Sequence, residues 1–149
     1  MTKVLAIDIG TSSVRTAVLD QRGRRWRDST ARRAVTLETD VTGRAEIAPN
    51  KLLGALRTCL NETHRWLDEH DQMVAAVGVA CFWHSALGVD AANRPVTPII
   101  TWADSRAAGE IDAMAGMLSP VHYHALTGCM LHASFWPARM RWWRHHRRA

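Results

Sequence analysis

The 149-residue sequence predicts an α/β domain with a hydrophobic core. Three observations predict it. Short apolar runs separated by turn-forming residues fill the first forty positions, an amphipathic helical pattern follows Pro49, and residues 73–82 form a nearly continuous apolar run. Hydrophobic residues make up 47% of the chain and charged residues 22%, which is typical of a globular rather than a disordered protein.

The N-terminal part favours three antiparallel strands. Residues 4–9 are an apolar run that ends at the turn-forming residues 10–12, a pattern typical of a buried strand entering a tight turn. Residues 14–19 resume the apolar pattern before the next turn, and residues 26–37 indicate a third, more polar strand. Because the connections are short, we expect a meander.

A helix and a buried strand are expected next. Pro49 suits the first turn of a helix. Residues at helical spacing form one stripe that we expect to face the sheet: Leu52, Leu53, Leu56, Leu60, Thr63 and Leu67. The apolar run 73–82 predicts a strand that is covered on both faces.

The remainder predicts short extended pieces followed by helices. Residues 87–89 and 99–102 indicate extended segments, and helix is expected from Asp104 onward. Ser119-Pro120 and Gly128 indicate the two ends of a short helix, and a last helix opens at Pro137 and runs to Ala149. This order of elements resembles the ribonuclease-H-like core that actin-type ATPases also use, an analogy that does not itself define a function.

Composition excludes several classes of protein. The sequence has no stretch of eighteen apolar residues and no signal-peptide pattern, so we expect no membrane partner and a cytoplasmic location. Its three cysteines are widely spaced, which favours neither a disulfide framework nor a zinc site. The net charge of +5 gathers in residues 22–27 and 139–148, which we interpret as solvated faces rather than as a nucleic-acid site.

The first candidate site surrounds Asp8. An ionised carboxylate at the end of a buried strand needs a partner, and Mg²⁺, which keeps several waters and takes few protein carboxylates, is a suitable one. Gly10 allows a sharp turn in which successive amides form an anion-binding nest, and the next three residues add hydroxyl donors: Thr11, Ser12 and Ser13. The alternative is that Asp8 accepts turn hydrogen bonds in an ordinary hairpin. The motif by itself favours neither interpretation over the other.

The second candidate site combines two segments that follow strands. Trp83 and His84 follow one strand, and Trp102, Asp104 and Arg106 follow another, at the strand ends where open α/β sheets place their ligands. Carboxylate, imidazole and guanidinium groups hydrogen-bond hydroxyls, and an indole offers an apolar wall to a sugar. Each residue also has a structural interpretation, such as Asp104 as a helix N-cap and Arg106 as its surface partner. Taken together, the five favour a site.

Several segments resemble the FGGY carbohydrate kinases. Residues 6–15 resemble the N-terminal phosphate motif of that family, and residues 101–107 resemble its W-x-D-x-R segment. Residues 82–85 fall where the family has a sugar-contacting loop. Residues 126–129 and 134–142 resemble the following T-G pair and its lysine- or arginine-bearing helix. The two tryptophan-containing segments are most similar to the gluconate- and xylulose-kinase branch.

The resemblance implies ATP-dependent, Mg²⁺-assisted transfer of a phosphoryl group to a hydroxyl of a sugar or sugar acid. It implies that Asp8 acts near the metal, at the catalytic phosphate end. It implies that the ATP phosphates are bound by Gly10, Thr11, Ser12, Ser13 and Arg15. It implies that the sugar pocket is lined by Trp83, His84, Trp102, Asp104 and Arg106. A homodimer is implied for the intact protein.

Family members have two ribonuclease-H-like domains with the active site between them. The resemblance places their catalytic base late in the first domain and their adenosine pocket in the second, and residues 1–149 match neither region. We therefore expect an incomplete N-terminal half without the C-terminal ATPase domain. Because phosphoryl transfer depends on positioning and on a base that orients the nucleophile, we expect this chain to be inactive alone.

Two other classes of function remain open from the residues. A nuclease of the Holliday-junction-resolvase type shares the fold and the strand-Asp-Gly opening, but it needs several converging carboxylates that the sequence does not place at strand ends. A non-catalytic interaction module would use the basic, tryptophan-rich end of the chain: Arg139, Arg141, Trp142, Trp143 and Arg144.

Overall fold

The computed structural model describes residues 2–146, which form two compact units. Of the described residues, the first unit contains 2–37 and 47–82, and the second contains 38–46 and 83–146. Within the described residues, no helix combines the length and the apolar character needed to cross a membrane.

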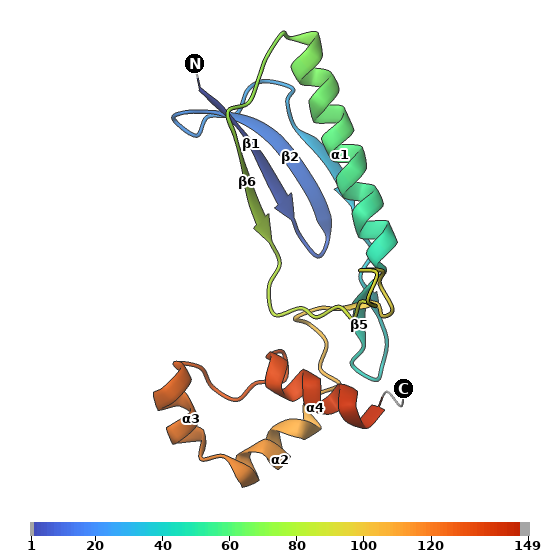
Figure 1. Ribbon diagram of the computed structural model, residues 1–149, viewed down its shortest axis with the longest axis vertical. Coiled ribbons are helices and arrows are strands. Elements are labelled where there is room, and N and C mark those ends of the chain that lie inside the picture. The colour runs from blue at the N-terminus through green and yellow to red at the C-terminus, as the bar shows by residue number, and fades with distance from the viewer. Residues whose placement is uncertain (1, 147–149) are drawn as a thin grey trace. The chain divides into compact units, whose positions relative to one another are not determined.

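A four-stranded sheet forms the centre of the first unit, in the order β3-β2-β1-β6 (Figure 1). Its strands are β1 (Lys3–Ile9), β2 (Ser13–Asp20), β3 (Ala31–Ala34) and β6 (Ala76–Cys81). The first three pair antiparallel, so the predicted meander is confirmed, with a shorter third strand. Strand β6 pairs parallel to β1. Three antiparallel strands, a helix and a parallel fourth strand are the order expected of a ribonuclease-H-like core.

Helix α1 (Pro49–Glu69) packs against β2 and β3 on one face of this sheet (Figure 1). Its buried side chains are Cys59, Thr63 and Trp66, so the expected leucine stripe is only partly correct, and Leu53 is exposed. The helix contacts β2 through Cys59 and Thr63, because these small side chains let the helix backbone approach the strand closely.

A hydroxyl pair connects the helix to the sheet. The Oγ1 atoms of Thr16 and Thr63 lie 2.6 Å apart, and Thr16 Oγ1 also donates to the carbonyl of Cys59 at 3.2 Å. Burial raises the pKa of the Cys59 thiol, which therefore stays protonated and donates to the carbonyl of Val14 at 3.5 Å. Val14 and Val18 are fully buried beside these contacts, so the polar groups lie inside an apolar core.

Strand β6 is not covered as the sequence predicted. All six of its residues are exposed, including Val77 at 56% and Val79 at 62%. The strand lies at the edge of the sheet, and α1 covers β2 and β3 instead. The prediction was wrong because an apolar sequence only makes burial favourable. Whether the strand is buried depends on which other elements of the fold pack against it.

The second unit combines a small sheet with three helices. The sheet has the order β4-β5-β7 and consists of β4 (Glu38–Thr39), β5 (Ala45–Ile47, whose last residue belongs to the first unit) and β7 (Ile99–Ile100). The helices are α2 (Gly109–Met117), α3 (Pro120–Thr127) and α4 (Trp136–His146). Helices α2 and α4 pack together around Ala107, Met114 and Ala138.

The helix ends agree with the sequence at α3 but not at α2. The hydroxyl of Ser119 accepts from the amide of His122 at 3.3 Å, and Gly128 ends α3 in the left-handed conformation, as predicted. Helix α2 begins at Gly109 rather than at Asp104, because residues 106–108 form a turn, closed by the bond from the Ala108 amide to the Ser105 carbonyl. The expected end of the last helix at Ala149 lies outside the described residues.

The buried hydroxyl pair should show strong coupling in a double-mutant cycle. Thr16→Val leaves the Thr63 hydroxyl without its partner and should cost about 1–3 kcal/mol of unfolding free energy. Thr63→Val should cost less, because Thr16 still donates to Cys59. The double variant should cost clearly less than the sum of the two, since no hydroxyl is left alone. Urea unfolding measures all three, and additive costs would contradict the pairing.

Candidate functional site

The turn between β1 and β2 is held tightly by its own backbone. The amide of Gly10 donates to the carbonyl of Ser13 at 2.9 Å, and the carbonyl of Ser12 accepts from the amide of Val35 at 3.0 Å. A Cβ atom on Gly10 would lie 3.0 Å from the Ser13 oxygen. Glycine is therefore favoured here by the close approach of two backbone segments.

This turn leaves two neighbouring amides free. Within residues 2–146, the amides of Thr11 and Ser12 donate to no protein acceptor. Thr11 is half-buried and Ser12 is exposed, whereas Ser13 is buried and offers the least accessible hydroxyl of the predicted phosphate-binding residues. Adjacent free amides at a turn are the donors that bind an anion.

Asp8 and Arg15 are cross-strand partners beside this turn. The Asp8 carboxylate lies 3.6 Å from the Arg15 guanidinium, and their side chains are 54% and 50% exposed. The premise that Asp8 is buried without a partner is therefore wrong. Its side chain points to the face of the sheet opposite α1, where it remains open to solvent. Because an exposed ion pair is weak, the carboxylate remains available to a cation.

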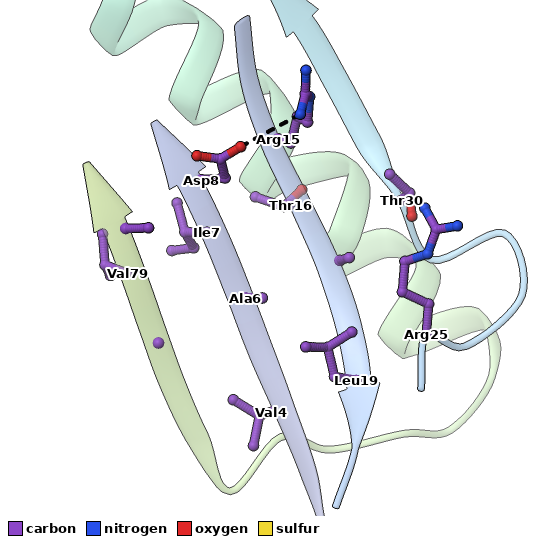
Figure 2. A pocket seen from close by; sticks show the side chains of 13 residues that line it. Val4, Ala6, Ile7, Asp8, Arg15, Thr16, Leu19, Arg25, Thr30 and Val79 are labelled. Carbon is purple, nitrogen blue, oxygen red and sulfur yellow. Dashed lines mark ion pairs between the residues drawn. The ribbon is translucent and has the colours of Figure 1, made fainter. Parts of the chain in front are cut away.

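Figure 2 shows Asp8 and Arg15 at one end of an open hollow of about 530 Å³ on this face of the sheet. The floor is apolar and includes Val4, Ala6 and Leu19, while Arg25 and Thr30 lie farther along its rim. The charge pattern of residues 22–27 predicts a solvated face for Arg25, and no motif marks Thr30. Their place along the rim follows from the path of the chain between β2 and β3, which no local pattern encodes.

In the second unit, Trp83 and His84 stack on each other. Their ring centroids are 4.6 Å apart, and the ring of His84 also contacts Phe135 at 4.6 Å. His84 is one of the few non-glycine residues with a positive φ, at 54°. A hollow of about 360 Å³ lies beside it, lined by His84, Tyr123, Thr127, Cys129, Phe135 and Trp136. No sequence motif marks Tyr123, whereas Thr127 belongs to the T-G pair of the family resemblance.

Asp104 makes several contacts within the protein. It is only 5% exposed, and its carboxylate accepts from the amide of Ala45 at 2.9 Å. The amide and the guanidinium of Arg106 also donate to it, at 2.7 to 3.1 Å. These bonds occupy both carboxylate oxygens, so Asp104 fixes the backbone around it.

Arg106 is held in the same network. Its guanidinium also donates to the carboxylate of Glu46 and lies over the ring of Trp142, 4.6 Å from the ring centroid. Burial alone would lower the pKa of Arg106, but its hydrogen bonds to Asp104 and Glu46 outweigh that effect and raise it. Trp102, by contrast, is 55% exposed and presents its ring to solvent.

The predicted residues thus form two groups. Asp8, residues 10–13 and Arg15 lie together at one end of the first unit. The segments that carry Trp83 and Trp102 lie in the second unit, where Ala86 and Ile100 join them through two backbone hydrogen bonds of 3.0 and 2.9 Å. Among residues 2–146, no three histidine, cysteine or acidic side chains gather as metal ligands.

The fold is the α/β, ribonuclease-H-like fold of an actin-type ATPase half-domain, and solved kinases share it. Xylulose kinase from Rhodospirillum rubrum superposes with a TM-score of 0.89 at 23% identity, covering 97% of this chain and 29% of that one. Plasmodium falciparum glycerol kinase with ADP superposes with a TM-score of 0.89 at 17% identity, covering 98% of this chain and 29% of that one.

Sequence comparison then gives the family. The profile described as "FGGY family of carbohydrate kinases, N-terminal domain" matches residues 3–149, and the chain belongs to this family. Gluconokinase of Bacillus subtilis (strain 168) is 26% identical over 132 residues, which is 87% of this chain and 24% of the relative. Xylulose kinase of Lactococcus lactis subsp. lactis (strain IL1403) is 29% identical over 118 residues, 79% of this chain and 23% of the relative.

The chain therefore spans about a quarter of the length of these curated relatives. The family assignment favours the kinase hypothesis over the junction-nuclease hypothesis, which the comparisons do not support.

Asp104 and Trp102 should differ sharply in their contribution to stability. Asp104→Ala removes a buried carboxylate, leaves the Ala45 amide without its acceptor and leaves Arg106 with Glu46 as its remaining carboxylate partner, which should cost about 1–3 kcal/mol of unfolding free energy. Trp102→Ala should change the free energy of unfolding by less than about 0.5 kcal/mol, because the ring is exposed. Denaturant unfolding of both variants measures this. A neutral Asp104→Ala would show that the carboxylate is free to serve a ligand.

Proposed function

We propose that this chain supplies the phosphate-binding turn and the sugar-binding loops of an ATP-dependent carbohydrate kinase. In the complete protein, the reaction would transfer the γ-phosphoryl group of ATP to a hydroxyl of a sugar or sugar acid. Family membership over residues 3–149 carries the proposal, together with the two free amides beside Asp8 and Arg15. A cytoplasmic location and a homodimer stay predictions from the family resemblance.

The turn residues fit a metal-bound polyphosphate. The amides of Thr11 and Ser12 would donate to phosphate oxygens, and Gly10 keeps the backbone in the geometry that exposes them. Arg15 would add positive charge beside the phosphates, and Asp8 would hold the metal directly or through water. Mg²⁺ bound to ATP neutralises charge that develops on the phosphate oxygens during transfer.

The sugar would contact the second unit. Trp102 and Trp83 expose indole rings that suit the C–H face of a sugar, and the His84 imidazole can hydrogen-bond a hydroxyl. Asp104 and Arg106 would act indirectly, by fixing the loop that carries Trp102. We propose no general base from this chain, because Asp104 is bound to Ala45 and Arg106. The relatives named gluconokinase and xylulose kinase support a sugar or sugar-acid substrate.

A titration of the purified chain with tripolyphosphate, with and without Mg²⁺, tests the phosphate site. We expect the amide NMR signals of Thr11 and Ser12 to shift most. Asp8→Asn should weaken binding of the magnesium form about tenfold, because the variant loses one charged contact to the metal. The same variant should leave binding of the metal-free anion unchanged or stronger, because a repelling charge is gone.

Asp68→Asn, which changes an exposed carboxylate on α1, is the matched control and should leave both affinities unchanged. The proposal fails if the wild-type chain does not bind millimolar tripolyphosphate, or if the largest shifts lie away from residues 8–15. It also fails if Asp8→Asn weakens the magnesium form and the metal-free form equally.

A further inference from the structure

The largest fully buried side chain of the described residues is an arginine. Arg139, on α4, is 2% exposed. Among residues 2–146 no carboxylate forms an ion pair with it, and its Nε atom is buried without an acceptor. A buried guanidinium in this setting requires an explanation, because charged groups inside proteins are normally paired.

Its donors reach three backbone carbonyls. One terminal nitrogen bonds the carbonyl of His84 and, at 3.0 Å, the carbonyl of Ile100, and the other bonds the carbonyl of Thr101. These carbonyls belong to the two segments that carry Trp83 with His84 and Trp102 with Asp104. A single side chain therefore holds both candidate sugar-binding segments to α4.

The same helix holds the first segment at a second point. The indole nitrogen of Trp136 donates to the carbonyl of Ser85 at 3.2 Å. His84, between Trp83 and Ser85, has a left-handed backbone, which costs free energy in a non-glycine residue and persists only where the surroundings enforce it. The bond from Arg139 to the His84 carbonyl is one such constraint.

An apolar side chain would fill this space at lower cost if packing were the sole requirement. Burial lowers the pKa of Arg139, and the negative charge of Asp104 offsets this effect only in part. The planar guanidinium, however, carries donors on both terminal nitrogens in a fixed geometry, and so it can hold separate carbonyls at a set spacing. Methionine cannot donate, and lysine concentrates its three donors on one atom.

We propose that Arg139 is a positioning residue that sets the spacing of the Trp83–His84 and Trp102 segments for sugar binding. This inference rests on the proposed function, because the sugar site itself is part of that proposal. Arg139 would not touch the sugar, since it is enclosed by backbone carbonyls. Its effect would reach the ligand through the His84 ring and the Trp102 loop.

The test compares Arg139→Met and Arg139→Lys with a control on the same helix. Arg141→Met is the control, because Arg141 pairs with Glu110 at 3.1 Å and contacts neither segment. Two quantities are measured on the whole chain: amide hydrogen exchange at residues 84–86 and 100–102, and affinity for D-gluconate, D-xylulose and glycerol by NMR titration. Arg139→Lys keeps the charge, and it provides the comparison if Arg139→Met does not fold.

We expect Arg139→Met to speed exchange at Ala86 and Ile100 and to weaken affinity for the bound sugar by about tenfold or more, the effect of losing charged hydrogen bonds. Arg139→Lys should fold and restore part of the affinity. Arg141→Met should match the wild type in both measurements, even if its stability falls slightly.

Unchanged exchange in both Arg139 variants would overturn the inference, whatever the sugar affinity. Faster exchange with unchanged affinity would also overturn it, by showing a structural role alone. If the wild-type chain binds none of the three sugars, the sugar-binding part of the proposed function fails, and the positioning role fails with it. If a sugar binds and only Arg141→Met weakens it, the positioning role alone is wrong.

Discussion

The register of β1 is the constraint on which the phosphate site depends. The strand lies between β2 and β6, and its pairing of Ile9 with Val14 sets which of its side chains face α1. Because side chains alternate along a strand, this register puts Asp8 beside Arg15 on the face away from the helix. A slip of one residue would turn the carboxylate under α1 and would move Gly10 from the position where two backbone segments approach.

Backbone carbonyls and amides, rather than side-chain packing alone, organise the loops of the second unit. Asp104 accepts from the amide of Ala45, and Arg139 donates to carbonyls of the two loop segments. Arg106 and Arg139 show two ways to bury a guanidinium: the first is paired with carboxylates, and the second is surrounded by carbonyl dipoles. The exposed rings of Trp83 and Trp102 follow from this arrangement, since the polar groups beside them fix the backbone.

Sequence periodicity predicted β1, β2 and α1 because each carries a local pattern of apolar residues. It failed for β6, whose exposure depends on which element covers it, and no local pattern contains that information. The motifs selected Asp104 as a sugar ligand, but one of its partners, the amide of Ala45, lies 59 residues away and could not be inferred from spacing. The basic composition of residues 139–148 predicted a solvated face for Arg139. Its carbonyl acceptors lie 38–55 residues away along the chain, so its burial could not be inferred from a local pattern.

A crystal structure of this chain grown with Mg²⁺ and a non-hydrolysable ATP analogue tests the phosphate site most directly. We expect phosphate oxygens within hydrogen-bonding distance of the Thr11 and Ser12 amides, with the metal on the Asp8 side, bound directly or through water. Phosphates bound elsewhere on the chain, or a turn whose two amides stay turned away from the bound nucleotide, would contradict the proposed site.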